Sequence, residues 1–294
     1  MMDVSIVIVN YNTRQMTAEC IDSVFAKTNW VEFEIILVDN ASTDGSKEFF
    51  EKDRRITYIY NNDNLGFGRA NNIGAKYASG KYLFLLNSDT LIATDNAIGE
   101  FFNYMESHPN TASCGGNLIN ENGEGIGSYG HFPSLLQVFS GIGFYRLYKN
   151  YHKEKLSLYQ KIYKKDIHNV DYIIGADIFI KQEIFNRVNG FDEDFFMYYE
   201  ETDLYWRLNK AGYKSVIIPN IKIIHLEGQS SKAKSQKNTN INKLKLLYKS
   251  EALFFRKNKP RYQIIILKIL KITSAIVHFY TGNLKDRFSI IINM

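Results

Sequence analysis

Two residues far apart in this 294-residue sequence have side chains that bind divalent metal ions. Asp89 closely follows the apolar run Tyr82–Leu86, and His225 directly follows the apolar run Ile221–Ile224. Mg²⁺ and Mn²⁺ take one or two carboxylate ligands together with substrate phosphates, and Mn²⁺ also accepts imidazole. We expect a divalent metal site if the fold brings Asp89 and His225 together. Each residue also has a plain structural explanation, as a turn or helix-capping aspartate and as a hydrogen-bonded surface histidine.

A cluster of acidic residues, Glu200-Glu201-Thr202-Asp203, precedes a segment whose apolar residues have helical spacing. Carboxylates at the start of a helix are favoured by the helix dipole alone, so capping explains the cluster. Adjacent carboxylates also repel one another, and burial of one raises its pKa towards the range of a general base. The aromatic residues between Phe195 and Tyr199 could provide that burial or simply belong to the core.

The elements that must position these residues alternate between strand and helix in the N-terminal half. Short apolar runs bounded by Asn, Asp or Gly predict strands, and segments with helical spacing lie between them. The predicted strands are Ser5–Val9, Ile35–Asp39, Thr57–Tyr60 and Tyr82–Leu86, and the predicted helices are Thr17–Lys27, Ser46–Lys52, Gly68–Ala78 and Asn96–Ser107. This alternation predicts an α/β fold with a mostly parallel, Rossmann-like sheet and helices on both faces.

Polar residues follow each of the four predicted strands. Ligands of open α/β sheets bind beyond the carboxyl ends of the strands, so these residues should line one crevice. They are Asn10-Tyr11-Asn12, Asp39-Asn40, Asn61-Asn62 and Asn87-Ser88-Asp89. Further on, the pattern predicts extended chain over Asp171–Ile180, helices near Gln182–Val188 and Thr202–Ala211, and strands at Ser215–Ile218 and Ile221–His225.

Two regions lack this alternation. Glu124–Asn169 has no clear period, and it is either an acceptor-binding region or a helical insert that packs its aromatic residues. Between Lys232 and Arg261 there are ten Lys or Arg residues against one acid, which predicts attraction to anionic surfaces. Gln263–Tyr280 is apolar but interrupted by two lysines, so we expect an interfacial helix that holds a C-terminal tail on a membrane surface.

The cellular location follows from the N-terminus and the tail together. Met1–Asp3 run straight into an apolar strand pattern without room for a secretory signal, so we expect a cytoplasmic protein peripheral to the inner membrane. The basic tail lacks a nucleic-acid docking motif, so no nucleic-acid partner is expected. We divide the chain into two larger parts, residues 1–118 and 119–230, and a helical tail at 231–294.

Several motifs in a fixed order resemble the inverting glycosyltransferases of family 2, which have the GT-A fold. The resemblance covers about residues 3–230. It implies that residues 1–118 bind the nucleotide-sugar donor and that residues 119–230 bind the acceptor and hold the catalytic residues. The pieces are Val7–Asn12, Val38–Gly45, Asn64–Gly74, Asn87-Ser88-Asp89, Gly175-Ala176, Gly190–Glu193, Glu200–Leu204 and His225. Any one piece is weak evidence, but the ordered set is strong.

The resemblance implies a role for each matching residue and a divalent cofactor, Mg²⁺ or Mn²⁺. The nucleotide-diphosphate sugar donor would contact Val9, Asn10, Tyr11, Asp39, Asn64, Gly66, Asn71, Asn87, Ser88 and Asp89. Asp89 and His225 would hold the metal, and Gly175, Ala176 and Asp203 would contact the acceptor, a hydroxyl of a glycan or lipid-linked glycan. Glu201 would be the catalytic base, with Glu200 as the other candidate.

Three residues depart from the usual family pattern. Asn87 replaces the first Asp of the metal-binding element, Glu201 is one methylene longer than the usual Asp, and Asn71 stands where many relatives have Arg. The Asn-x-Asp form and the loop after Asn64 resemble the rhamnosyltransferase branch of bacterial surface polysaccharide synthesis, including O-antigen, and this favours a dTDP-linked deoxysugar such as rhamnose.

Two other functions are compatible with parts of this pattern. A Rossmann dehydrogenase would need glycines in the turn after the first strand, where Tyr11-Asn12-Thr13 stands instead. A catalytically impaired protein of the same fold, which binds nucleotide sugar or glycan at the membrane, is favoured by the changes at Asn87 and Glu201. Turnover of a nucleotide sugar separates this alternative from the enzyme.

Overall fold

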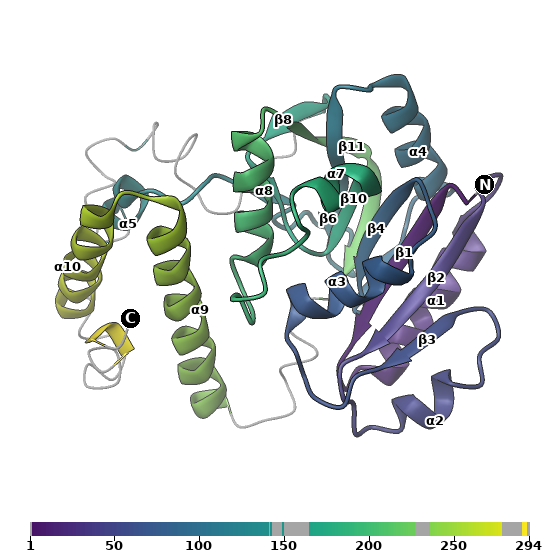
Figure 1. The fold of residues 1–294 in the computed structure, drawn as a ribbon, viewed down its shortest axis with the longest axis horizontal. Coiled ribbons are helices and arrows are strands. Elements are labelled where there is room, and N and C mark those ends of the chain that lie inside the picture. Colours follow the sequence, from purple (N-terminus) through teal and green to yellow (C-terminus); the bar gives the residue numbers. More distant parts are fainter. Residues whose placement is uncertain are drawn as a thin grey trace.

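A nine-stranded sheet forms the centre of the computed structural model, which describes residues 2–140, 142, 149, 165–226, 236–277 and 290–292 (Figure 1). The strand order is β3-β2-β1-β4-β10-β6-β11-β5, and β8 also pairs with β11. The strands are β1 (Val4–Asn10), β2 (Phe33–Asp39), β3 (Thr57–Tyr60), β4 (Tyr82–Asn87), β5 (Thr90–Ile92), β6 (Thr111–Ile119), β8 (His168–Val170), β10 (Asp177–Lys181) and β11 (Lys214–His225). A separate two-stranded sheet pairs β7 (Tyr129–Gly130) with β9 (Tyr172–Ile173).

The first half of the large sheet is parallel, because the helices between β1, β2, β3 and β4 return the chain to the same edge. The register aligns Asn10 with Asp39, and Val9 with Asn87. The carboxyl ends of these strands therefore meet at one edge, as the polar strand ends predict. In the second half, β10 runs antiparallel to β4 and β6, whereas β6 and β11 are parallel.

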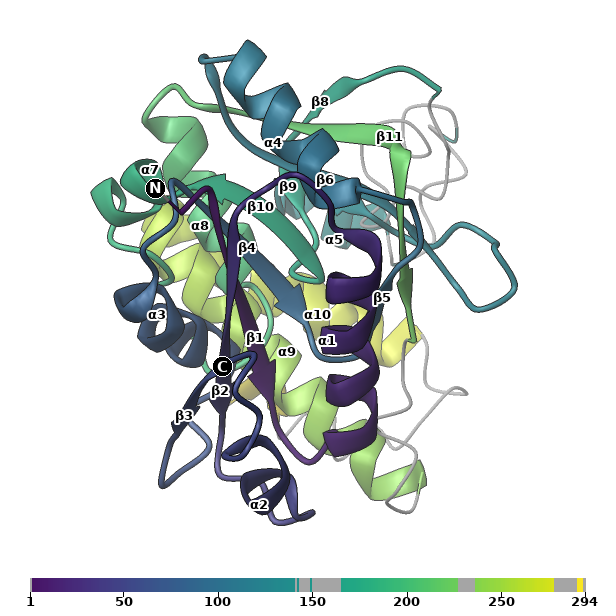
Figure 2. The same ribbon diagram turned by 90° about the vertical axis from the view of Figure 1, so that its right-hand side faces the viewer.

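Helices cover both faces of the sheet, so the predicted α/β class is confirmed (Figure 2). One face packs against α1 (Arg14–Lys27) and α4 (Ala97–Ser107), and the other packs against α3 (Phe67–Tyr77), α7 (Gln182–Arg187) and α8 (Glu200–Lys210). Two short helices, α2 (Ser46–Phe50) and α5 (Leu135–Ser140), complete this part of the chain. Burial of Ile21, Val24 and Phe101 on one face and of Leu204 and Leu208 on the other fixes the layers.

The structure corrects several predicted boundaries. The extended prediction over Asp171–Ile180 divides into β9 and β10, and the two strands predicted between Ser215 and His225 form the single strand β11, which has an irregular register between Ile217 and Lys222. α2 ends at Phe50 rather than Lys52. α8 begins at Glu200, two residues earlier than predicted, because acidic residues are favoured in a first helical turn.

The C-terminal region is helical, as predicted, and lies beside the three-layered part next to α8 (Figure 1). Its described residues include α9 (Gln236–Asn258) and α10 (Arg261–Val277), which share a third apolar core that includes Phe254, Phe255 and Leu267. Among the described residues, no helix is both long and apolar enough to span a bilayer. The division at residues 118 and 230 stays a prediction, because one sheet holds strands of both larger parts.

Candidate active site

Asp39 lies at the carboxyl end of β2, where three donors fix its carboxylate. Its Oδ2 accepts hydrogen bonds from Asn10 Nδ2 at 3.1 Å and from Tyr58 Oη at 3.0 Å, and its Oδ1 accepts one from the Ser42 amide at 2.8 Å. Asp39 and Asn10 are both fully buried. Tyr11, in contrast, is 48% exposed at the same edge. In this arrangement Tyr11 presents a surface to a ligand, and direct donor contact by Asp39 and Asn10 stays a prediction.

Asn40 connects the end of β2 with the loop that precedes α3. Its Nδ2 donates to Asn64 Oδ1 at 3.0 Å and to the Gly66 carbonyl at 3.2 Å, while its Oδ1 accepts from the Leu65 amide at 3.2 Å. Asn71 is buried within α3, and its amide donates to the Phe67 carbonyl at 3.0 Å. Asn71 therefore stabilises its own helix here, and its predicted donor contact stays untested.

Gly66 allows the segment Asn64–Gly68, which we call the donor loop for its predicted role, to approach the segment that leads into α8. Its φ of +84° is unfavourable for other residues, and a Cβ added there would lie 2.1 Å from the Phe196 carbonyl oxygen. We expect Gly66→Ala to lower the free energy of unfolding by about 2 kcal/mol or more, through strain and the forced separation of the two loops. Urea unfolding measures this, with Gly123→Ala as the control, because Gly123 has a similar φ of +77° but open space around its Cβ. Equal losses in the two variants would contradict the packing argument.

Asp89 and His225 are brought together by the antiparallel pairing of β5 with β11. His225 aligns with Thr90, the Leu226 amide donates to the Asp89 carbonyl at 2.9 Å, and His225 Nε2 lies 3.3 Å from Asp89 Oδ1. Next to them, the hydroxyls of Ser88 and Thr13 are 3.0 Å apart, and the Asn87 amide donates to the Ala176 carbonyl at 3.0 Å. The condition set by the sequence, that the sheet places these two residues together, is met.

The Asp89–His225 pair fits part of a divalent metal site. Two adjacent ligands at about 2.1 Å from one cation lie about 3 Å apart, close to the spacing of this pair. Among the described residues, no group of three or more His, Cys, Asp or Glu side chains could hold a metal. Asp89 and His225 alone would therefore leave the coordination shell of the ion incomplete. This is the usual arrangement for Mg²⁺ or Mn²⁺ that is bound together with substrate phosphates.

Glu200 and Glu201 occupy the first turn of α8 after an unusual backbone segment. Tyr198 and Tyr199, which precede them, both have a φ of +68°. Glu200 is 4% exposed, its Oε2 has no hydrogen-bond partner, and burial together with the nearby Glu201 charge raises its pKa well above the usual range. Burial also raises the pKa of Glu201 to about 7. Glu201 is thus suited to accept a proton near neutral pH, and burial disfavours the ionised form of Glu200.

The raised pKa of Glu200 makes stability depend on pH. Because the folded state disfavours the ionised form, the contribution of Glu200 is full below its unfolded pKa, near 4.5, and is lost as pH rises through the folded value. Glu200→Gln cannot ionise, so at pH 8 we expect it to be more stable than the wild type by about 1 kcal/mol or more. Urea unfolding at pH 5 and pH 8 tests this, and an equal difference at both pH values would contradict it.

The predicted acceptor residues already have partners within the protein. Asp203 is 1% exposed, with Oδ1 accepting from Asn258 Nδ2 and Oδ2 from Arg207 Nε, both at 2.7 Å. Ala176 is also buried, and a Cβ added at Gly175 would lie 3.3 Å from the Phe67 ring. Their contact with an acceptor stays a prediction, and the structure gives Asp203 a structural role in this state.

The donor loop joins the two groups of candidate residues. The Phe67 amide donates to the Phe196 carbonyl at 3.2 Å, and a Cβ added at Gly68 would lie 3.5 Å from Glu200 Cβ. Phe67 also faces Gly175, one residue before the carbonyl that accepts from Asn87. The strand-end residues, the loop and the start of α8 therefore form one contiguous site.

Sequence reasoning missed residues that hold this site together, chiefly Tyr58 and Thr13. Tyr58 stands in a strand whose alternation reads as packing, and only its register beside β2 places its hydroxyl on Asp39. Asn40, in contrast, was predicted to line the crevice because it stands at a polar strand end.

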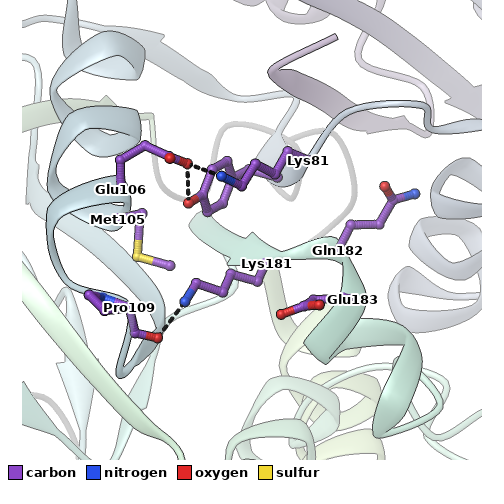
Figure 3. Close-up of a pocket in the computed structure, with 8 residues that line it drawn as sticks. Lys81, Met105, Glu106, Pro109, Lys181, Gln182 and Glu183 are labelled. Carbon is purple, nitrogen blue, oxygen red and sulfur yellow. Dashed lines mark hydrogen bonds and ion pairs between the residues drawn. The ribbon is translucent and has the colours of Figure 1, made fainter. Parts of the chain in front are cut away.

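A pocket of about 340 Å³ lies elsewhere, at the start of β4 and the end of β10 (Figure 3). Lys81 and Glu106 form an ion pair in it, and Lys181 Nζ donates to the Pro109 carbonyl at 2.6 Å. None of the predicted site residues lines it. The lysines are already paired, and the pocket is at the opposite end of the strands from the candidate site.

The fold matches the GT-A class of nucleotide-sugar-dependent glycosyltransferases. The mannosyltransferase PcManGT from Pyrobaculum calidifontis, solved with GDP-Man and Mn²⁺, aligns with 99% of this chain and 79% of its own, at 15% identity and a TM-score of 0.60. GalNAc-T7, solved with UDP, GalNAc and Mn²⁺, aligns with 100% of this chain and 54% of its own, at 16% identity and a TM-score of 0.63. At these identities the likeness establishes the fold.

The family follows from sequence. The profile of glycosyl transferase family 2 matches residues 5–188, and the chain belongs to this family. It is 31% identical over 126 residues to the glycosyltransferase GlyG of Streptococcus pneumoniae, a match that covers 36% of this chain and 42% of that protein. It is 28% identical over 208 residues to the rhamnosyltransferase WbbL of Escherichia coli, covering 66% of this chain and 72% of that protein. The chain thus spans less than half the length of the first of these relatives.

Proposed function

We propose that this protein transfers a sugar from a nucleotide-diphosphate donor to a hydroxyl group of a glycan or lipid-linked glycan, with inversion at the anomeric carbon. The observation that carries the proposal is the contiguous site itself. Asp89 and His225 meet at 3.3 Å at the strand ends, and the donor loop connects this edge to Glu200 and Glu201. A family 2 chain with the GT-A fold and such a site has the groups that glycosyl transfer needs.

In the proposed reaction Glu201 accepts the proton of the acceptor hydroxyl as its oxygen attacks the anomeric carbon. The bond between that carbon and the diphosphate oxygen breaks, and the nucleoside diphosphate leaves with the electron pair. A single displacement on the opposite face inverts the configuration. A divalent ion on Asp89 and His225, when bound, would neutralise charge on the diphosphate. Burial and the nearby Glu201 charge disfavour ionisation of Glu200, which favours a single negative charge at this pair.

The sugar is proposed to be a deoxyhexose such as rhamnose, donated as a dTDP sugar for a bacterial surface polysaccharide of the O-antigen kind. Support comes from the Asn87-Ser88-Asp89 element and from the similarity to WbbL, named a rhamnosyltransferase. The O-antigen biosynthesis protein RfbC of Myxococcus xanthus is also 26% identical over 235 residues. The proposed acceptor region, Glu124–Asn169, lies partly outside the described residues, namely at 141, 143–148 and 150–164.

A donor panel tests the proposed function. Purified protein with Mn²⁺ is mixed with dTDP-, UDP- or GDP-sugars and a lipid-linked glycan extract, and the product masses are determined. We expect the mass of one deoxyhexose to be added from the dTDP sugar. A protein that binds a donor but adds no sugar from any of them would instead be the non-catalytic binder that the changes at Asn87 and Glu201 allow.

The C-terminal helices are proposed to hold the enzyme on the cytoplasmic face of the membrane, where a lipid-linked acceptor would be found. α10 has one continuous face of exposed apolar side chains, because their positions recur at intervals of three, four, seven or eight residues. They are Tyr262, Ile265, Ile266, Ile269, Ile276 and Val277, five of which are more than half exposed. Arg261 and Lys268 flank this face, and the basic run from Lys232 to Arg261 precedes it, which favours an anionic bilayer as partner.

Replacing Ile265 and Ile269 with serine should weaken binding to anionic vesicles about 10–100-fold, because two large apolar side chains no longer enter the bilayer. Cosedimentation with phosphatidylglycerol vesicles measures this. Phe49→Ser is the control, since Phe49 is 52% exposed but lies on α2. Unchanged sedimentation of the double variant would contradict the proposed membrane contact.

A further inference from the structure

The segment from Asp192 to Tyr199, which we call the entry segment, leads into α8. Its last two residues have unfavourable backbone angles, so other contacts must hold the segment in this conformation. Tyr198 and Tyr199 are both left-handed, a conformation that costs about 1 kcal/mol or more for an aromatic residue and persists only where surrounding contacts impose it. These two residues set the direction of the first turn of α8, which holds Glu200 and Glu201. The contacts that hold this entry segment therefore determine where the proposed base points.

Polar groups of α9 hold the entry segment at two places. Lys257 Nζ lies 2.6 Å from both Asp192 Oδ2 and Asp194 Oδ2, and the Lys257 side chain is only 32% exposed. Ser250 Oγ donates to the Met197 carbonyl at 2.8 Å. The two acids also raise the pKa of Lys257, which keeps it charged. Lys257 and Ser250, both in α9, therefore contact the beginning and the end of the entry segment.

A third polar contact from α9 reaches α8 itself. Asn258 Nδ2 donates to Asp203 Oδ1 at 2.7 Å, and the Asp203 side chain is 2% exposed. The other Asp203 oxygen accepts from Arg207, which also donates to the Gly190 carbonyl at 2.8 Å. Buried, charge-assisted hydrogen bonds of this kind are strong and specific in geometry. Asn258 thus fixes the rotation of the first turn of α8.

Apolar side chains of the entry segment also pack against α9. Phe195 is fully buried in the third core with Phe254 and Phe255 of α9, and the ring of Tyr199 lies 5.8 Å from that of Phe254. On its other side the segment contacts the donor loop, through the Phe196 carbonyl and the Phe67 amide. The entry segment is held between α9 and the donor loop, and α9 lies outside residues 5–188 of the family profile.

We propose that Lys257 and Asn258 of α9 are positioning residues, which aim the Glu201 carboxylate by holding the Asp192–Tyr199 segment and the first turn of α8. The proposal rests on the proposed function, because it assigns these residues to the same reaction. The C-terminal helices would then position the base in addition to contacting the membrane. The hydrogen bond between Asn258 and the buried Asp203 is part of this positioning.

Kinetics of Lys257→Met test the positioning role, because methionine keeps the apolar stem and removes the charge. We expect kcat to fall about 10-fold with donor KM nearly unchanged, since a displacement of the base of under 1 Å affects the chemical step rather than donor binding. Lys257→Arg should restore most of kcat. Lys214→Met is the control, as Lys214 is an exposed lysine at the start of β11.

Hydrogen exchange tests the same inference without substrate, so its outcome is independent of the proposed function. In Lys257→Met and Asn258→Ala, amides of residues 195–203 should exchange at least about 10-fold faster, whereas those of β1 and β4 should be unchanged. If both variants show the same exchange rates and the same kcat as the wild type, the proposal is overturned. Faster exchange across the whole chain, with kcat of the folded fraction intact, would also overturn it, because it would indicate a merely structural role.

Discussion

Glu201→Gln is expected to lower kcat for sugar transfer by about 10²–10⁴-fold and to leave donor affinity nearly intact, because the amide has the size of the carboxylate but cannot accept the acceptor proton. In the wild type, kcat/KM should rise with pH through about 7, since the base acts in its deprotonated form and burial raises the pKa of Glu201 to about 7. Initial rates between pH 5.5 and 9, together with a donor-binding titration, measure both effects.

Glu183→Gln is the matched control for Glu201→Gln, because Glu183 is an exposed glutamate at the start of α7. It should transfer sugar at the wild-type rate. Transfer that survives in Glu201→Gln but is lost in Glu200→Gln would move the base to Glu200, and transfer that survives in both would remove α8 from the chemistry.

Asp89→Asn is expected to have the second large effect. Removing the one carboxylate of the pair should lower kcat/KM by about 10²-fold or more and weaken Mn²⁺ binding in the presence of the nucleoside diphosphate, because Asn87 cannot replace the lost charge. Mn²⁺ binding followed by electron paramagnetic resonance gives a reading that does not depend on turnover.

Asp95→Asn is the control for Asp89→Asn, since Asp95 lies on the surface in an ion pair with Lys27 and is 83% exposed. His225→Ala should show a smaller loss in the same direction, as an imidazole supplies no negative charge. Transfer by Asp89→Asn at the wild-type rate, with Mn²⁺ binding unchanged, would mean that the proposed metal site lies elsewhere.

The parallel half of the sheet could be predicted from sequence because β1, β2 and β4 are mainly apolar runs that end in Asn or Asp, and β3 alternates and is followed by Asn61. β6 could not, because Gly115 and Gly116 interrupt its pattern. A Cβ at Gly115 would lie 2.7 Å from the Ile173 side chain, and one at Gly116 would lie 2.7 Å from the Ile221 carbonyl. Glycine is needed at these two positions because segments distant in sequence pack closely against them. The local sequence pattern does not show such packing.

The candidate site was predictable where a residue stands at the end of an element, as Asp89 and His225 do. It was not predictable where burial decides the outcome. Asp203 and Asn71 have the residue types of ligand contacts, and the contacts of Asp203 with α9 and of Asn71 within α3 appear only in the structure. Their ligand roles stay predictions. Likewise, the basic run before Arg261 predicted a positively charged surface. In the structure, Lys257 of this run forms ion pairs with Asp192 and Asp194.

The site combines features that cost stability with features that favour proton transfer. Two adjacent glutamates follow two left-handed tyrosines, and Glu200 is buried with a carboxyl oxygen that has no partner. Such strain is characteristic of functional sites, where surrounding contacts maintain it. The expected gain in stability of Glu200→Gln at pH 8 and the expected loss of activity of Glu201→Gln follow from the same burial.

Release of nucleoside diphosphate is the most direct test of the central claim, that this site breaks the bond between a sugar and a nucleoside diphosphate. The measurement uses the wild type and Glu201→Gln with a dTDP-deoxysugar, Mn²⁺ and a glycan acceptor, and follows nucleoside diphosphate by chromatography. We predict release by the wild type, in step with product, and release by Glu201→Gln slower by about 10²-fold or more. Tight donor binding by the wild type without release, across dTDP, UDP and GDP sugars, would contradict the claim.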